Sequence, residues 1–254
     1  MTEAGGGRTI DDVLTRMTAT LSAMPQELAP RRAFLATYQR TTRAVAKALE
    51  AAAFEDPGWV EAWDVVFADL YLDALEADLA GDPRHRAPRP WRLAFDAPPT
   101  LPPLRQVLLG INAHINYDLP QALLGVISDA DFTDPVLLDR RRRDHERIDG
   151  VLAARVAAED DELSAQSAKS VLDRVLTPLN RAASTRFLRE ARTKVWHNTM
   201  ELQRARVVGP EAYAVRLAEL EVLSAARIAD LLAPGQVLLR LAVAGFGVML
   251  PPEG

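Results

Sequence analysis

The sequence predicts an all-α fold, a single-domain multi-helix bundle of about eight to ten helices, and two observations carry this prediction. Apolar residues recur mostly at spacings of three and four, and strand-like alternation is rare. The chain has 254 residues, of which 48% are apolar, and this is ample for one continuous core. We therefore expect residues 1–254 to form one helical domain, with residues 1–8 as a disordered tail.

The first three helices are predicted over residues 9–24, 31–54 and 56–81. Thr9 is a plausible N-cap of the first helix. The third helix opens with an Asp-Pro pair and stops at a glycine, which is a matched start and stop signal. The apolar faces of the first two helices contain Ile10, Val13, Leu14, Met17, Leu21, Phe34, Tyr38, Val45 and Leu49.

Residues 82–103 contain seven prolines and are predicted to form an extended loop. After this loop the helical patterns resume, and the last long one is expected to bend at Pro178. The predicted helices are 104–119, 120–129, 135–158, 161–208, 210–232 and 235–249.

Composition excludes several classes of function. The chain has no cysteine, which excludes disulfides, Cys-ligated zinc and thiol catalysis, so His and carboxylates must hold any metal. A net charge of −5 argues against nucleic acid as a partner. The longest apolar run, 237–250, is shorter than the roughly 20 residues that span a bilayer, and the N-terminus does not resemble a secretory signal. A cytoplasmic protein without a membrane span is therefore expected.

The stretch "GINAHINYDL", residues 110–119, places polar residues inside an apolar segment. His114 and Asp118 are four residues apart and share one face of a helix, which suits a catalytic pair or two metal ligands. Asn112 and Asn116 are poor residues for a helix interior, so they predict a buried polar network. An alternative stays open, in which Asp118 caps the next helix and His114 is a core histidine bonded to a backbone carbonyl.

Other acidic residues and histidines are candidate metal ligands. Asp69 and Asp73 share a helix face, as do His145 with Asp149 and His197 with Glu201. The alternative for Asp69 and Asp73 is a solvent-facing helix surface, and the charged segment "DRRRRDHERIDG" favours a solvated His145 over a ligand. The candidate metal ligands, for Zn, Mn or Fe, are His114, Asp118, Asp69, Asp73, Asp149 and His197.

The motif "GINAHINYDLPQALL" resembles the DUF5995 proteins, a bacterial family of unknown function that is common in actinobacteria. The likeness extends through "FEDPGWVEAWDVVFADLYLDAL", "PWRLAF" and "RRRDHERIDGVL" and covers most of residues 30–155. It implies that the family pattern marks Asn112, His114, Asn116, Asp118 and Pro120. The spacing from His114 to Asp118 is also similar to the metal-binding H-x-x-x-D of the all-helical zinc phospholipase C group, although the N-terminal Trp expected there is missing.

Three functions follow from these residues as hypotheses, and a small-molecule substrate is the expected partner of the first two. The first is a metal-dependent hydrolase of a small molecule or phosphoester, in which bound water is the nucleophile. The second is a metal-free isomerase or cyclase of a bacterial biosynthetic pathway, with His114 as general acid or base. The third is a non-catalytic helical binding protein. The expected catalytic residues are His114, Asp118, Asn112 and Asn116, and Tyr117 and Trp196 are expected to contact substrate.

Overall fold

The computed structural model describes residues 8–82, 84–163, 178–235, 245 and 247–252. Over these residues the regular structure is helical and no strand occurs, so the all-α prediction is confirmed. The helices are α1 (Ile10–Ala23), α2 (Ala29–Glu50), α3 (Pro57–Ala80), α4 (Arg89–Phe95), α5 (Pro103–Ala113), α6 (Leu119–Val126), α7 (Pro135–Leu163), α9 (Pro178–Val208) and α10 (Pro210–Leu232). Two short 3₁₀ turns, η1 (Gln26–Leu28) and η3 (Asp131–Thr133), and a π turn, η2 (His114–Asp118), complete them.

Local signals explain where these helices begin and end. Thr9 caps α1 as predicted, in a reciprocal capping box with Asp12. The carboxylate of Asp56 accepts the backbone N–H of Trp59 at the start of α3. At the other end of α3, Gly81 adopts a left-handed φ of 65°, which an L side chain rarely adopts.

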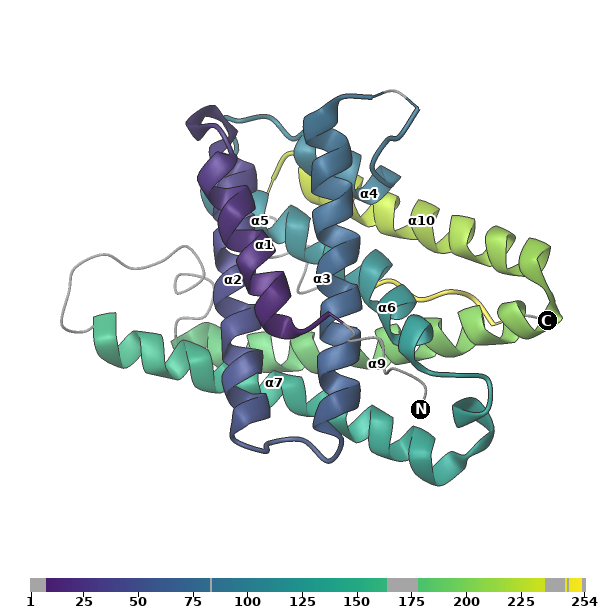
Figure 1. Cartoon of the computed structure of the whole chain (residues 1–254). Helices are drawn as coiled ribbons and strands as arrows, with labels where there is room; N and C mark the ends of the chain where they lie inside the picture. Colours follow the sequence, from purple (N-terminus) through teal and green to yellow (C-terminus); the bar gives the residue numbers. More distant parts are fainter. Residues whose placement is uncertain (1–7, 83, 164–177, 236–244, 246, 253–254) are drawn as a thin grey trace, which may run out of the picture.

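The helices pack in two directions (Figure 1). α1, α2 and α3 run beside one another, and α7 and α9 cross them. α6 packs on both α3 and α9, while α10 packs on α4, α5 and α9. The motif segment α5–η2–α6 therefore lies between the two sets of helices and contacts both.

The predictions for residues 82–103 and for the described part of residues 235–249 are wrong. The expected loop over residues 82–103 contains α4, because Pro88 and Pro90 stand at the N-cap and in the first turn of that helix, where a missing N–H costs no hydrogen bond. The expected helix over 235–249 is absent at residues 235, 245 and 247–249. The rest of that expected helix, residues 1–7 of the expected tail and residues 164–177 of the expected helix 161–208 lie outside the described residues.

No described helix is both long enough and apolar enough to cross a membrane. The described core is instead that of a bundle, with aromatic side chains from α2, α3 and α4 at its centre. The largest fully buried side chains include Trp63, Trp91 and Tyr71. Of these, Trp91 and Tyr71 lie beside His114, the histidine of the motif.

Candidate functional site

The motif histidine stands at the start of a π turn. The backbone N–H of Leu119 donates to the carbonyl of His114, five residues back. Pro120 has no N–H, and a wider turn accommodates its ring without breaking the helix. The helix boundary predicted at Leu119 is wrong, because this residue keeps helical angles (φ −63°, ψ −41°). The α5–η2–α6 segment is consequently one continuous helical path.

The side chains of His114 and Asp118 meet in the core. His114 Nδ1 lies 2.9 Å from Asp118 Oδ2, and the indole N–H of Trp91 donates to the same oxygen at 2.8 Å. The side chain of Asp118 makes no capping hydrogen bond to the backbone of α6. His114 is hydrogen-bonded to the carboxyl group of Asp118 and not to a backbone carbonyl. The capping alternative is therefore wrong, and Asp118 joins η2 to α4.

Aromatic rings enclose the imidazole. Phe67 of α3 is stacked on it at 3.5 Å and 4°, and the Tyr38 ring of α2 stands edge-on at 4.5 Å and 76°. Three further rings have centroids within 6.3 Å, namely Tyr71, Trp91 and Phe34. We call these five residues the aromatic cage. Inside it the histidine is only 4% exposed.

Burial changes the protonation of the pair. Desolvation lowers the pKa of His114 well below its usual value and raises the pKa of Asp118 well above its own, against the opposing hydrogen bond from Trp91. Both shifts favour the uncharged form of each group. In that form one proton lies between Asp118 Oδ2 and His114 Nδ1, and the second is on Nε2.

The second nitrogen of the imidazole makes no hydrogen bond. His114 Nε2 is buried without a partner, and so is the hydroxyl of Tyr71 in the same cage, whereas the hydroxyl of Tyr38 lies close to that of Thr42. Burial raises the pKa of both tyrosines, so both keep their protons. Unpaired polar groups are costly in a core, and each of them calls for an explanation.

The two asparagines of the motif belong to another face of the segment. Asn112 donates to the carbonyl of Leu108, and Asn116 donates to Asn112 Oδ1 at 3.3 Å. Asn116 Oδ1 also accepts the backbone N–H of Val248 at 3.2 Å. The predicted buried polar network is confirmed, and it fastens the C-terminal segment rather than the imidazole.

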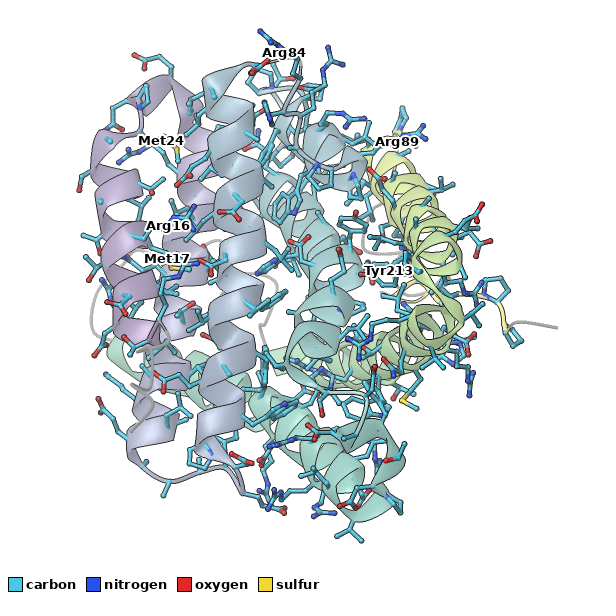
Figure 2. The ribbon with its side chains drawn as sticks, turned by 45° about the vertical axis from the view of Figure 1, so that its right-hand side comes forward. Arg16, Met17, Met24, Arg84, Arg89 and Tyr213 are labelled. Atoms are coloured by element: carbon cyan, nitrogen blue, oxygen red, sulfur yellow. The ribbon has the colours of Figure 1, made fainter. Side chains whose placement is uncertain are left out.

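The acidic pair on α3 lies against α1. Arg16 of α1 bonds Asp69 at 3.0 Å and Asp73 at 2.7 Å, and Figure 2 shows Arg16 between the two helices. Arg8 pairs with Asp69 as well. The side chain of Asp73 is 68% exposed. These carboxylates are occupied by guanidinium groups and make no contact with His114.

The remaining predicted residues are dispersed. His197 bonds the carbonyl of Leu250 at 2.9 Å, and Asp149 pairs with Arg192 at 3.0 Å. Tyr117 packs in a separate small apolar cluster with Leu124 and Leu202, and Trp196 packs against the main core. In the part of the chain that the structure describes, no three His, Asp or Glu side chains gather as metal ligands do. The predicted set of six metal ligands therefore stays a prediction.

The prediction of a solvated His145 is wrong. Its side chain is fully buried, near Trp63 and Trp196 at ring distances of 6.3 and 5.9 Å. Arg143, two residues before it, pairs with Asp139 of α7 and with Glu55 of the α2–α3 loop. The arginines of this segment thus lie on the outer face of α7, and His145 lies on the face that packs against the core. Sequence spacing also missed Trp91, whose partner is 27 residues away.

Gly110 of the motif is required for close packing. A Cβ atom built there would lie 2.5 Å from Cδ2 of Phe34, a ring of the aromatic cage. We expect Gly110→Ala to lower the free energy of unfolding by about 1–3 kcal/mol, because Phe34 must shift in a filled core. Urea unfolding measures this, with Gly150→Ala as control, since no atom lies within 4 Å of a Cβ there. Equal stability of the two variants would contradict the packing argument.

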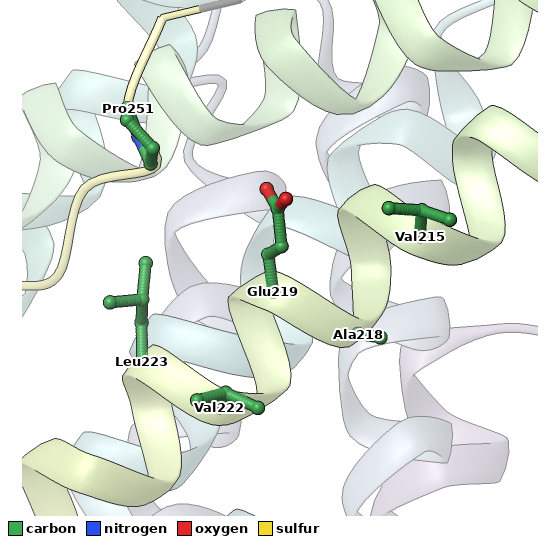
Figure 3. Close-up of a pocket in the computed structure, with 6 residues that line it drawn as sticks. All are labelled: Val215, Ala218, Glu219, Val222, Leu223 and Pro251. Carbon is green, nitrogen blue, oxygen red and sulfur yellow. The ribbon is translucent and has the colours of Figure 1, made fainter.

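A hollow on the surface lies elsewhere (Figure 3). It follows α10 beside Pro251, and its lining is mostly apolar, with Val215 and Val222 more than half exposed. Neither His114 nor Asp118 lines it. The buried pair and this hollow are therefore separate features.

Fold and site define a class of protein, an all-helical bundle with a buried, uncharged His–Asp pair inside an aromatic cage. Residues 10–234 match the model of DUF5995, a family of unknown function, and the chain belongs to this family. The resemblance seen in the motif is thereby confirmed. No curated protein and no solved structure matched the chain.

Proposed function

We propose that this protein is a metal-free acid–base enzyme, of the isomerase or cyclase type, in which His114 transfers a proton to a small substrate. The observation that carries the proposal is the free Nε2 atom of an imidazole whose other nitrogen is held by Asp118. Such an arrangement fixes the ring and leaves one nitrogen for chemistry. Trp91 and Phe67 hold the carboxyl group and the ring in place.

The uncharged pair supports proton donation. In the proposed step, the N–H bond at Nε2 breaks as its proton goes to the substrate. The proton on Asp118 moves to Nδ1 at the same time, so the imidazole stays neutral and the new negative charge is on the carboxylate. The indole N–H of Trp91, already on Asp118 Oδ2, stabilises that charge. The product forms when another carbon of the protonated substrate loses its proton to Nε2 and the proton on Nδ1 returns to Asp118, which restores the pair.

The cage indicates what the substrate is like. Its walls are aromatic, and its free polar atoms are His114 Nε2 and the hydroxyl of Tyr71. A small, mostly apolar molecule with one polar group or double bond suits such walls, and aromatic faces stabilise positive charge that develops after protonation. Entry requires local opening, because the ring is 4% exposed.

The same burial favours a second candidate, a non-catalytic helical protein. A hydrogen-bonded His114–Asp118–Trp91 chain joins η2 to α4 and can act as a structural link alone. The metal-dependent hydrolase expected from the sequence stays a prediction. Its test is included in the experiment that follows.

The proposal is tested by incubating the full chain with a metabolite extract in D₂O and following masses. We expect a compound to be converted into an isomer that carries one solvent-derived deuterium, in the presence of EDTA. His114→Gln is expected to lower this rate about 100-fold or more, because the proton donor is lost. His197→Gln is the matched control and is expected to retain the rate.

Three outcomes contradict the proposal. Loss of turnover with EDTA and with His197→Gln, together with products that have gained water, indicates the metal-dependent hydrolase. Equal rates for wild type and His114→Gln exclude His114 as the acid. No conversion in any sample, combined with a large loss of stability in His114→Gln, favours the non-catalytic protein.

A further inference from the structure

A second group of buried polar side chains lies where α3, α7 and α9 meet. It contains Asp64, His145 and Arg192, which are 3%, 0% and 7% exposed. Burial lowers the pKa of His145, and the charge of Arg192 lowers it further. Burial also raises the pKa of Asp64, and the charge of Arg192 opposes that rise. Arg192 of α9 pairs with Asp149, which stands one turn after His145 on α7. Asp64 follows Trp63 on α3, and the Trp63 ring is 6.3 Å from that of His145.

Polar atoms of this group lack partners. Asp64 Oδ2, both ring nitrogens of His145 and Nη1 of Arg192 are buried without a hydrogen bond. The indole N–H of Trp63, whose ring is 6.3 Å from that of His145, is unpaired as well. Several unpaired donors in one buried place are unusual, because native cores satisfy nearly all such groups.

We propose that Asp64, His145 and Arg192 form a binding site for a small carboxylate. The free groups are mainly donors, namely the guanidinium N–H of Arg192, a ring N–H of His145 and the indole N–H of Trp63. A guanidinium group is a well-suited partner for a carboxylate. Trp63 and Trp196 flank His145 at ring distances of 6.3 and 5.9 Å, so the proposed ligand is a small one such as formate or acetate.

One edge of this site reaches the solvent. Arg192 Nε bonds Asp149 at 3.0 Å, and the side chain of Asp149 is 20% exposed against 8% for Arg192. The ion pair thus lies at the rim and keeps one end of the guanidinium occupied. Nη1 on the inner side stays available for the ligand.

The protonation of Asp64 controls the affinity. An uncharged Asp64 donates its proton to the carboxylate, whereas a charged one repels it. The pKa of Asp64 is raised to about 7. Burial is the main cause, the charge of Glu61 adds to the rise, and the charge of Arg192 opposes it. The charge of Asp64 also raises the pKa of Tyr38 on α2. His145 on α7 is uncharged at neutral pH, because burial lowers its pKa.

The test is a titration of the full-length protein with sodium acetate, followed through the indole N–H signal of Trp63. We expect a saturable shift at pH 6 and about tenfold weaker binding at pH 8, because the uncharged fraction of Asp64 falls about tenfold around its pKa of about 7. Arg192→Met is expected to remove the saturable shift. Asp64→Asn is expected to make the affinity independent of pH, which keeps the proposal testable if Arg192→Met does not fold.

Sodium chloride at the same ionic strength and the variant Glu146→Gln, on the exposed side of α7, are the controls. Chloride is expected to leave the Trp63 signal in place, and Glu146→Gln to retain acetate binding. A shift that is equal with chloride, or one that persists in Arg192→Met, overturns the proposal. So does a Trp63 signal that acetate leaves unchanged. This test does not involve His114, so it stands or fails apart from the proposed enzyme activity.

Discussion

Replacing Asp118 by alanine is expected to lower the free energy of unfolding by about 2–6 kcal/mol at pH 4.5. The variant leaves Trp91 Nε1 and His114 Nδ1 buried without a partner, and each such loss costs about 1–3 kcal/mol. The loss is expected to shrink as the pH rises. The pKa of Asp118 is raised in the folded state, so folding favours the protonated carboxyl group. The contribution of Asp118 to stability is therefore complete at pH values below its unfolded pKa and decreases as the pH rises above that value.

Asp118→Asn is the matched comparison. Its amide oxygen can accept both the indole N–H of Trp91 and a proton on His114 Nδ1, so stability near that of the wild type is expected. The amide has no acidic proton to pass on, so the proposed proton transfer is expected to be lost. Urea unfolding of both variants at several pH values measures the difference. Equal losses for alanine and asparagine would show that the hydrogen bonds of Asp118 contribute little.

Asp64→Asn is expected to change how stability depends on pH. In the wild type, burial raises the pKa of Asp64 in the folded state to about 7, against an ordinary value of 3.8. Stability due to this group is present below the unfolded pKa and falls by about 1.4 kcal/mol per pH unit until the folded pKa is reached. Between pH 4.5 and 8 the variant is therefore expected to gain about 3 kcal/mol relative to the wild type.

The measurement is urea unfolding of both proteins across this range. Asp118 and the histidines contribute equally to both proteins, so the difference isolates Asp64. Asp73→Asn, on the exposed part of α3, is the control and is expected to follow the wild type. Parallel curves for Asp64→Asn and wild type would mean that Asp64 is charged in the folded core.

Helix periodicity and capping signals predicted most of the fold. Thr9 and Gly81 act as their types suggest, because caps depend on neighbouring residues alone. The failures have physical causes. α4 was missed because the density of prolines in residues 82–103 is typical of a loop. The helix continues through Pro120 by means of a π turn, which the spacing of apolar residues does not reveal.

The site was predicted only in part. The i, i+4 spacing identified His114 with Asp118, because their contact lies within one turn. It also suggested Asp69 and His197, whose partners prove to be Arg16 and the carbonyl of Leu250. Partners far along the chain, such as Trp91, depend on helix packing, which a single sequence does not encode in its spacing.

The protonation of His114 tests the central claim most directly. Ring ¹⁵N shifts of the four histidines, with His114 assigned by its absence in His114→Gln, are recorded between pH 8 and pH 5. The buried pair predicts an uncharged imidazole over this whole range, with a proton on Nε2. A His114 signal that titrates near 6.5, as a solvent-exposed imidazole does, or an Nε2 without a proton, would contradict the account.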